Sequence, residues 1–116
     1  MEEGSTWIEI YPMGQRRWTQ PMDVLGGSIY VMGGRGNPAH RSNERFTPNS
    51  WSYIADQYAG DEVVGSCIAA DEEANVIYQF GGYAWNVGYL NRIVKYYPSS
   101  NSWGSWQASY AGLLLF

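Results

Sequence analysis

Two polar loops carry most of the residues suited to chemistry or recognition. Each follows a glycine pair: residues 35–43 read RGNPAHRSN after Gly33-Gly34, and residues 83–91 read YAWNVGYLN after Gly81-Gly82. The first loop offers guanidinium groups, which pair with carboxylates through two parallel hydrogen bonds. The second offers Tyr and Trp, which are enriched at the energetic centres of protein interfaces. The candidate partner-binding residues are Arg35, Asn37, His40, Arg41, Asn43, Tyr83, Trp85, Asn86 and Tyr89.

Side chains that usually perform catalysis or bind metals are scarce. His40 is the one histidine of the chain, so a His-rich metal site is impossible, and we interpret it as a loop hydrogen-bonding residue. Cys67 is the one cysteine, which excludes an internal disulfide, and within VVGSCIAA we expect it to be a small buried hydrophobe. Asp61-Glu62 and Asp71-Glu72-Glu73 resemble solvated turns. We therefore expect no enzyme, no metal and no cofactor.

Composition narrows the class of protein further. The chain has 116 residues, 45% of them hydrophobic and 16% charged, which is typical of one packed domain. Its net charge of −4 offers no basic surface for nucleic acid. The N-terminal stretch MEEGSTWIEI does not resemble a signal peptide, and no apolar run approaches the roughly 20 residues of a membrane span. We expect a cytoplasmic setting without membrane contact.

Short β-strands must position the two loops, because nothing of useful length has helical periodicity. Gly, Pro, Asn and Ser interrupt the chain at short intervals, and β-branched and aromatic residues lie between them. The pattern predicts strands near Trp7–Ile10, Pro21–Leu25, Ser28–Met32, Glu44–Thr47, Trp51–Ile54, Val64–Ala70, Val76–Phe80, Arg92–Tyr97 and Trp103–Gln107. Regularly spaced short strands indicate an all-β sandwich, barrel or propeller.

An internal repeat decides among these architectures. Tyr30 and the pair Gly33-Gly34 recur 48 residues later as Tyr78 and Gly81-Gly82. The string RFTP at residues 45–48 recurs as KYYP at 95–98, and Trp51 recurs as Trp103. The spacing drifts from 48 to 52 because two loops differ in length, which is what a fixed β core with variable loops would show.

The ordered set of Tyr, Gly-Gly, aromatic, Pro and Trp resembles the kelch repeat, and the resemblance covers almost the whole chain. The family's unit is a four-stranded blade of a β-propeller. The resemblance implies an all-β fold with two four-stranded antiparallel blades and flanking partial strands. Thr47 and Tyr97 depart from the pattern, since the family usually has Asp at that place.

The resemblance also divides the chain. Residues 1–18 are expected to form the outer strand of a preceding blade and a linking loop, residues 19–63 the first repeat, residues 64–107 the second, and residues 108–116 the truncated start of another blade. Packing roles are expected for the repeated residues Tyr30, Gly33, Gly34, Phe46, Trp51, Tyr78, Gly81, Gly82, Tyr96 and Trp103.

Function follows only as a class. The resemblance implies a module that binds a protein or peptide partner through its loops, with adaptor or scaffold roles by analogy. Two blades do not close a propeller, so the chain is expected to be part of a longer propeller or to assemble as a homo-oligomer. A kelch-type sugar epimerase stays open as a less favoured alternative. A copper radical oxidase is excluded, because its two His ligands cannot come from one histidine. An alternative also stays open, in which Arg35 and Arg41 are solvated loop residues and Trp85 caps a blade edge.

Overall fold

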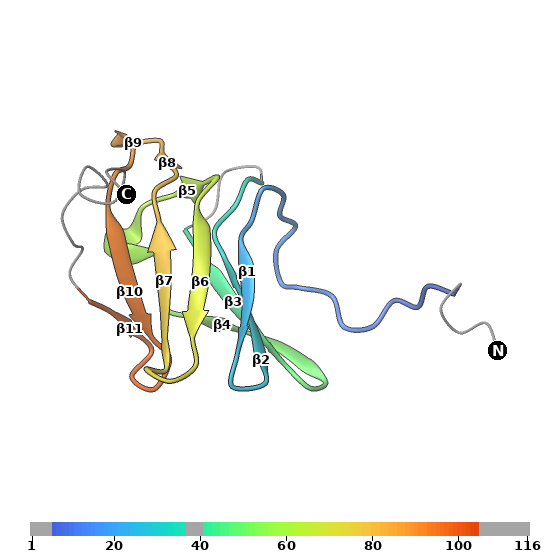
Figure 1. Cartoon of the computed structure of the whole chain (residues 1–116). Coiled ribbons are helices and arrows are strands. Elements are labelled where there is room, and N and C mark those ends of the chain that lie inside the picture. The colour runs from blue at the N-terminus through green and yellow to red at the C-terminus, as the bar shows by residue number, and fades with distance from the viewer. Residues whose placement is uncertain (1–5, 37–40, 105–116) are drawn as a thin grey trace.

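The computed structural model describes residues 6–36 and 41–104, and its regular structure is almost entirely β (Figure 1). The strands are β1 (Met22–Leu25), β2 (Ser28–Met32), β3 (Asn43–Thr47), β4 (Ser50–Ile54), β5 (Val63–Val64), β6 (Cys67–Asp71), β7 (Val76–Phe80), β8 (Tyr83–Ala84), β9 (Gly88–Tyr89), β10 (Ile93–Tyr97) and β11 (Ser102–Trp103). One 3-10 turn, η2, spans Tyr58–Gly60. Within the described residues, no helix has the length and apolar character needed to cross a membrane.

Two four-stranded antiparallel sheets, here called blade 1 and blade 2, form the body of the molecule. Blade 1 has the order β1-β2-β3-β4, and blade 2 has the order β6-β7-β10-β11 from its inner to its outer strand. Figure 1 shows the two sheets side by side, with the small sheet β5-β8-β9 at the end of the blades away from their hairpin turns. The predicted all-β fold with two four-stranded blades is confirmed.

Strand register shows that the blades are structural repeats of each other. Tyr30 lies opposite Arg45 in blade 1, and Tyr78 lies opposite Lys95 in blade 2. Phe46 lies opposite Trp51, as Tyr96 lies opposite Trp103. Their ring centroids are 5.0 Å and 5.3 Å apart, respectively. The aromatic pair of each repeat therefore joins the two outer strands of its own blade.

The core lies between the blades. Leu25, Tyr30 and Met32 of blade 1 pack against Ile77 and Tyr96 of blade 2. The rings of Tyr30 and Tyr96 are 6.1 Å apart, in a tilted arrangement. Burying such side chains stabilises the pair of blades by roughly 25 cal/mol for each Å² of apolar surface removed from water.

Each repeat Trp also ties its blade to the chain that precedes it. The indole N–H of Trp103 donates a hydrogen bond of 2.7 Å to the carbonyl oxygen of Asp56, just after blade 1. The indole N–H of Trp51 donates in the same way to the carbonyl oxygen of Tyr11, at 2.6 Å. The N-terminal segment therefore contacts blade 1 through the same indole hydrogen bond by which the segment after blade 1 contacts blade 2.

Four expectations about the strands differ from the structure. Trp7–Ile10 is not a strand, because among the described residues no neighbouring strand pairs with it. The predicted strand Val64–Ala70 is divided into β5 and β6 by Gly65, which has φ +69°. Residues 83–91 contain the short hairpin β8–β9 rather than only loop. Strand β11 ends at Trp103, and residues 105–116 lie outside the described residues.

Cys67 is exposed, so the expectation of a buried thiol is wrong. The cause is strand alternation, since successive side chains of β6 point to opposite faces. Ile68 and Ala70 pack against the core, whereas Cys67 and Ala69 lie on the open face of blade 2.

Candidate partner-binding face

The glycine pairs lie where each blade's second strand ends and a segment from the preceding linker crosses it. The second glycine has φ +101° in both repeats, a left-handed conformation that favours glycine. A Cβ on Gly34 would lie 3.0 Å from the carbonyl oxygen of Trp18, and one on Gly82 would lie 2.9 Å from that of Val64. The pairs are therefore needed for close backbone approach, and both loops start from the same structural position.

The segments that gather at this end of the molecule are called the loop face. They are the linkers 15–20 and 57–66 and the segments 35–36, 41–42 and 83–92. Strand β5 of the linker pairs with β8, and Trp18 forms an isolated β-bridge with Arg35 at the equivalent place in blade 1. Main-chain pairing thus fixes the base of the face, which gives its side chains a rigid support.

Arg35 lies between elements of both blades. The backbone N–H of Arg35 donates to the Trp18 carbonyl at 2.6 Å, and the Trp18 N–H donates back at 2.9 Å. The guanidinium carbon is 5.1 Å from the centroid of the Trp18 ring and 5.4 Å from that of Trp85. Such cation–π contacts contribute about 0.5–1 kcal/mol each at exposed sites.

Arg41 is held by an acid on the face. Its Nη2 is 3.2 Å from Oε2 of Glu62, and more than half of its side chain is exposed. The two residues line a shallow hollow of about 210 Å³ together with Gly60, Trp85 and Asn86. The hollow offers a donor, an acceptor and one aromatic wall.

A second ion pair lies beneath the segment 83–92 of blade 2. Arg92 Nη2 lies 2.9 Å from Oδ2 of Asp61, and both side chains are largely buried. The Arg92 guanidinium also lies 5.1 Å from the ring centroid of Tyr58. The Asn86 side-chain amide donates to Oδ1 of Asp61 at 3.2 Å, so this contact holds one predicted binding residue in place.

Aromatic residues form the most exposed part of the face. Tyr83 packs edge-on against Trp85 at 5.4 Å and Tyr89 at 5.1 Å between ring centroids. Trp85 remains 51% exposed and Tyr89 90% exposed, although Tyr89 lies in the paired strand β9 and Trp85 in the turn that joins β8 to β9. Ordered aromatics that stay in contact with water are well suited to binding, because little entropy is lost when a partner covers them.

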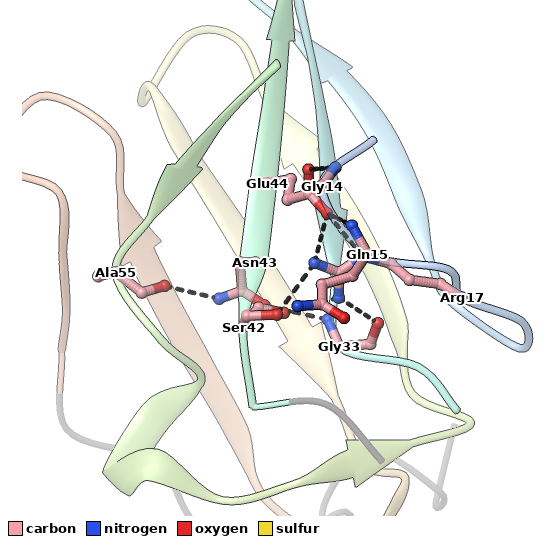
Figure 2. Close-up of polar contacts among 8 residues, drawn as sticks. All are labelled: Gly14, Gln15, Arg17, Gly33, Ser42, Asn43, Glu44 and Ala55. Carbon is pink, nitrogen blue, oxygen red and sulfur yellow. Dashed lines mark hydrogen bonds and ion pairs between the residues drawn. The ribbon is translucent and has the colours of Figure 1, made fainter. Parts of the chain in front are cut away.

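Asn43 does not belong to this face, and its expected role as a binding residue is corrected. Its side chain is fully buried. It accepts a hydrogen bond of 3.0 Å from the Gly33 N–H and donates one of 2.9 Å to the Ala55 carbonyl (Figure 2). Asn43 therefore connects the glycine pair to the end of β4 and has no atom available to a partner.

A buried ion pair beneath the face was not expected from the sequence. Arg17 Nη2 lies 2.8 Å from Oε2 of Glu44, and both side chains are inaccessible to water. Figure 2 shows that Glu44 also accepts from the backbone N–H groups of Gly14 and Gln15, while Arg17 donates to the carbonyl oxygens of Gly33 and Ser42. The pair secures the N-terminal segment, and so the position of Trp18.

The structure does not place every predicted residue. Asn37 and His40 lie outside the described residues. In the part of the chain that is described, no group of His, Cys, Asp and Glu side chains is arranged to hold a metal ion. Trp18 and Arg92 were missed as loop-face residues. Only strand pairing in the structure aligns Trp18 with Val64 beside the second glycine pair, because the two residues lie at different distances before their glycines in the sequence.

Comparison with known proteins supports this description. No protein-family profile matches the chain. Kelch-like protein 23 of Mus musculus is 30% identical over 113 residues, which is 92% of this chain and 19% of the mouse protein. The structure of YjhT, a kelch-type β-propeller, matches with a TM-score of 0.65 and 21% identity, over 79% of this chain and 27% of YjhT.

The chain thus spans about a fifth of the curated relative and about a quarter of the solved propeller. The similarity to YjhT is one of fold, and the similarity to Kelch-like protein 23 is one of sequence. With the repeated glycine pairs and the two matching blades, they show that this chain belongs to the kelch-repeat β-propeller family.

Proposed function

We propose that the chain is a protein-interaction module, a part of a kelch propeller that binds a protein or peptide partner through its loop face. The observation that carries the proposal is the set of ordered, exposed aromatics on that face, Trp18, Trp85 and Tyr89. Aromatic anchors surrounded by polar groups are the usual energetic centres of interfaces. The relative's name identifies it as kelch-like, which is consistent with a binding role.

Binding is favoured over catalysis by the character of the face. Its acids are engaged, Asp61 with Arg92 and Glu62 with Arg41. A hydrolytic or epimerising site needs an acid or base free to exchange a proton with substrate. Within the described residues, the hollow beside Trp85 is open and shallow, whereas small-molecule sites are usually enclosed enough to bury most of the ligand.

Selection from a random-peptide library displayed on phage tests the proposal. Peptides that bind the intact chain should bind a Trp85→Ala/Tyr89→Ala variant at least about tenfold more weakly, because hot-spot aromatics each contribute about 2 kcal/mol. Tyr53→Ala removes an exposed aromatic from β4, away from the loop face, and should leave the affinity unchanged. Equal loss in both variants, or in neither, would contradict binding at this face.

A second proposal concerns the open side of blade 1. Strand register aligns its Met22 and Val24 with Ile68 and Ala70, which pack against blade 1 in the core between the blades. Met22 and Val24 are 52% and 50% exposed. We propose that this face receives another blade, supplied by a second copy of the chain, as in three copies giving six blades.

Light scattering coupled to size-exclusion chromatography checks this second proposal. A discrete trimer that Val24→Glu converts to monomer would support it, because a charge in an apolar interface is costly. Val87→Glu introduces the same charge at an exposed valine of the β8–β9 turn, away from this side of blade 1, and is the matched control. A stable monomer at all concentrations would overturn assembly by copies and leave the binding proposal untouched.

A further inference from the structure

Arg35 differs from Arg17, Arg41 and Arg92 because, within the described residues, no acid pairs with it. Arg17 pairs with Glu44, Arg41 with Glu62 and Arg92 with Asp61. Within the described residues, the Arg35 side chain makes no hydrogen bond and no ion pair, and its guanidinium lies against the rings of Trp18 and Trp85. A cation that is fixed but unpaired is an acceptor site for an anionic group from outside the chain.

The geometry holds this guanidinium ready for a ligand. Two backbone hydrogen bonds fix the Arg35 main chain to Trp18, and the aromatic rings restrict the side chain. Trp18 is in turn placed by the buried Arg17–Glu44 pair one residue earlier in the chain. Stacked arginine keeps a planar set of N–H donors that matches a carboxylate, and little entropy is lost on binding.

We propose that Arg35, clamped by Trp18 and Trp85, receives the carboxylate of an Asp or Glu side chain in an extended peptide segment of the partner. This inference rests on the proposed function, since it names the chemistry that the loop face recognises. Trp85 contacts the guanidinium and also lines the hollow shared with Arg41 and Glu62, so the residue after the acid can enter that hollow. This second peptide residue is expected to be polar, because Glu62 offers it a carboxylate acceptor and Asn86 an amide.

Charge favours a single carboxylate over a polyanion. The chain has a net charge of −4, and the acids Asp61 and Glu62 lie on the same face as Arg35. A nucleic acid needs several unpaired cations along its backbone, and each additional phosphate would approach these acids. One isolated guanidinium between aromatic rings instead matches one acidic residue flanked by uncharged ones.

The peptide selection described above also tests this proposal when its output is sequenced. Enriched peptides should contain one Asp or Glu at a fixed position. Replacing that residue by Asn or Gln should weaken binding about tenfold or more, as should Arg35→Gln in the protein, because a charge-assisted hydrogen bond contributes about 1.5–3 kcal/mol. Arg35→Lys keeps the charge without the planar donors and should also weaken binding. Lys95→Gln, which removes the same charge from β10, should have no effect.

The outcomes separate this inference from the proposed function. Peptides that depend on Trp85 and Tyr89 but carry no acid, and bind Arg35→Gln equally well, would overturn the Arg35 assignment and leave the binding face standing. Enrichment of peptides with several clustered acids, rather than one, would also overturn it. So would stronger competition by inorganic phosphate or single-stranded DNA than by the Asp-containing peptide. Loss of all peptide binding in Tyr53→Ala would overturn both. Thermal unfolding of each variant establishes that it is folded.

Discussion

The two blades have residues of opposite character, charged in one and apolar in the other, at one structurally equivalent position. The bridge between Trp18 and Arg35 corresponds to the pairing of Val64 with Tyr83, so Arg17 corresponds to Val63. On the facing strand, Glu44 lies opposite Val31, and its counterpart Val94 lies opposite Gln79. Blade 1 therefore has a buried ion pair where blade 2 has two buried valines.

This difference shows which features the blade requires and which it tolerates. The glycine pair, the outer aromatic pair and the indole hydrogen bond are the same in both blades. The position beneath the glycines accepts either a satisfied ion pair or an apolar pair. Since burying two charges carries a desolvation cost that their attraction only partly offsets, the pair in blade 1 is best explained by anchoring. It fixes Gly14, Gln15 and Ser42, and through them the linker that carries Trp18.

The largest expected effect comes from breaking this ion pair on one side. Glu44→Gln leaves the Arg17 guanidinium buried without a counter-charge, and Arg17→Val leaves the Glu44 carboxylate in the same state. Each should lower the free energy of unfolding by about 3–5 kcal/mol. Urea unfolding followed by tryptophan fluorescence measures this loss.

The double variant Arg17→Val/Glu44→Val copies blade 2 and sharpens the comparison. It removes both charges together, so its loss of stability should be smaller than that of either single variant. Losses that add in the double variant would show that the two residues act independently and that the blades are not interchangeable at this position.

The repeat tryptophans should differ in their contribution, although they occupy the same place in the repeat. Trp103 packs against the core between the blades and donates to Asp56, whereas Trp51 connects blade 1 only to the N-terminal segment. Trp103→Ala should therefore lower the free energy of unfolding by about 3 kcal/mol, and Trp51→Ala by about half as much. Guanidinium unfolding monitored by circular dichroism compares the two. A smaller loss for Trp103→Ala than for Trp51→Ala would contradict the assigned core.

Much of the fold could be predicted from the sequence because the repeat restricts it at several levels. The spacing of Gly33-Gly34, Phe46 and Trp51, repeated once, specifies the strand order of a blade. Strand β2, from Ser28 to Met32, has the predicted bounds because the glycine pairs 26–27 and 33–34 lie on either side of it.

The candidate site was less predictable, because it depends on side chains that come together from different blades. Arg35 meets Trp85 across 50 residues, and no local pattern links them. Asn43 looked like part of a polar loop, but strand register aligns it with Ile93, an apolar position of β10. Its side-chain amide bonds to the Gly33 N–H and to the Ala55 carbonyl just after β4, two contacts that form only in the folded chain.

The smallest expected effect is a difference between the blades in how their stability depends on pH above 10. Burial, aided by the nearby Tyr30, raises the pKa of Tyr96 to about 12, from an ordinary value of 10, while Arg45 acts in the opposite direction. The equivalent residue of blade 1 is Phe46, which does not titrate. The folded state retains the Tyr96 proton where the unfolded state loses it, so its contribution to stability is complete below pH 10 and declines as the pH rises from 10 toward 12.

Tyr96→Phe should therefore lose less stability than the parent over this interval, in urea unfolding at a series of pH values. Parallel curves for Tyr96→Phe and the parent would show that the Tyr96 hydroxyl titrates alike in the folded and unfolded chain.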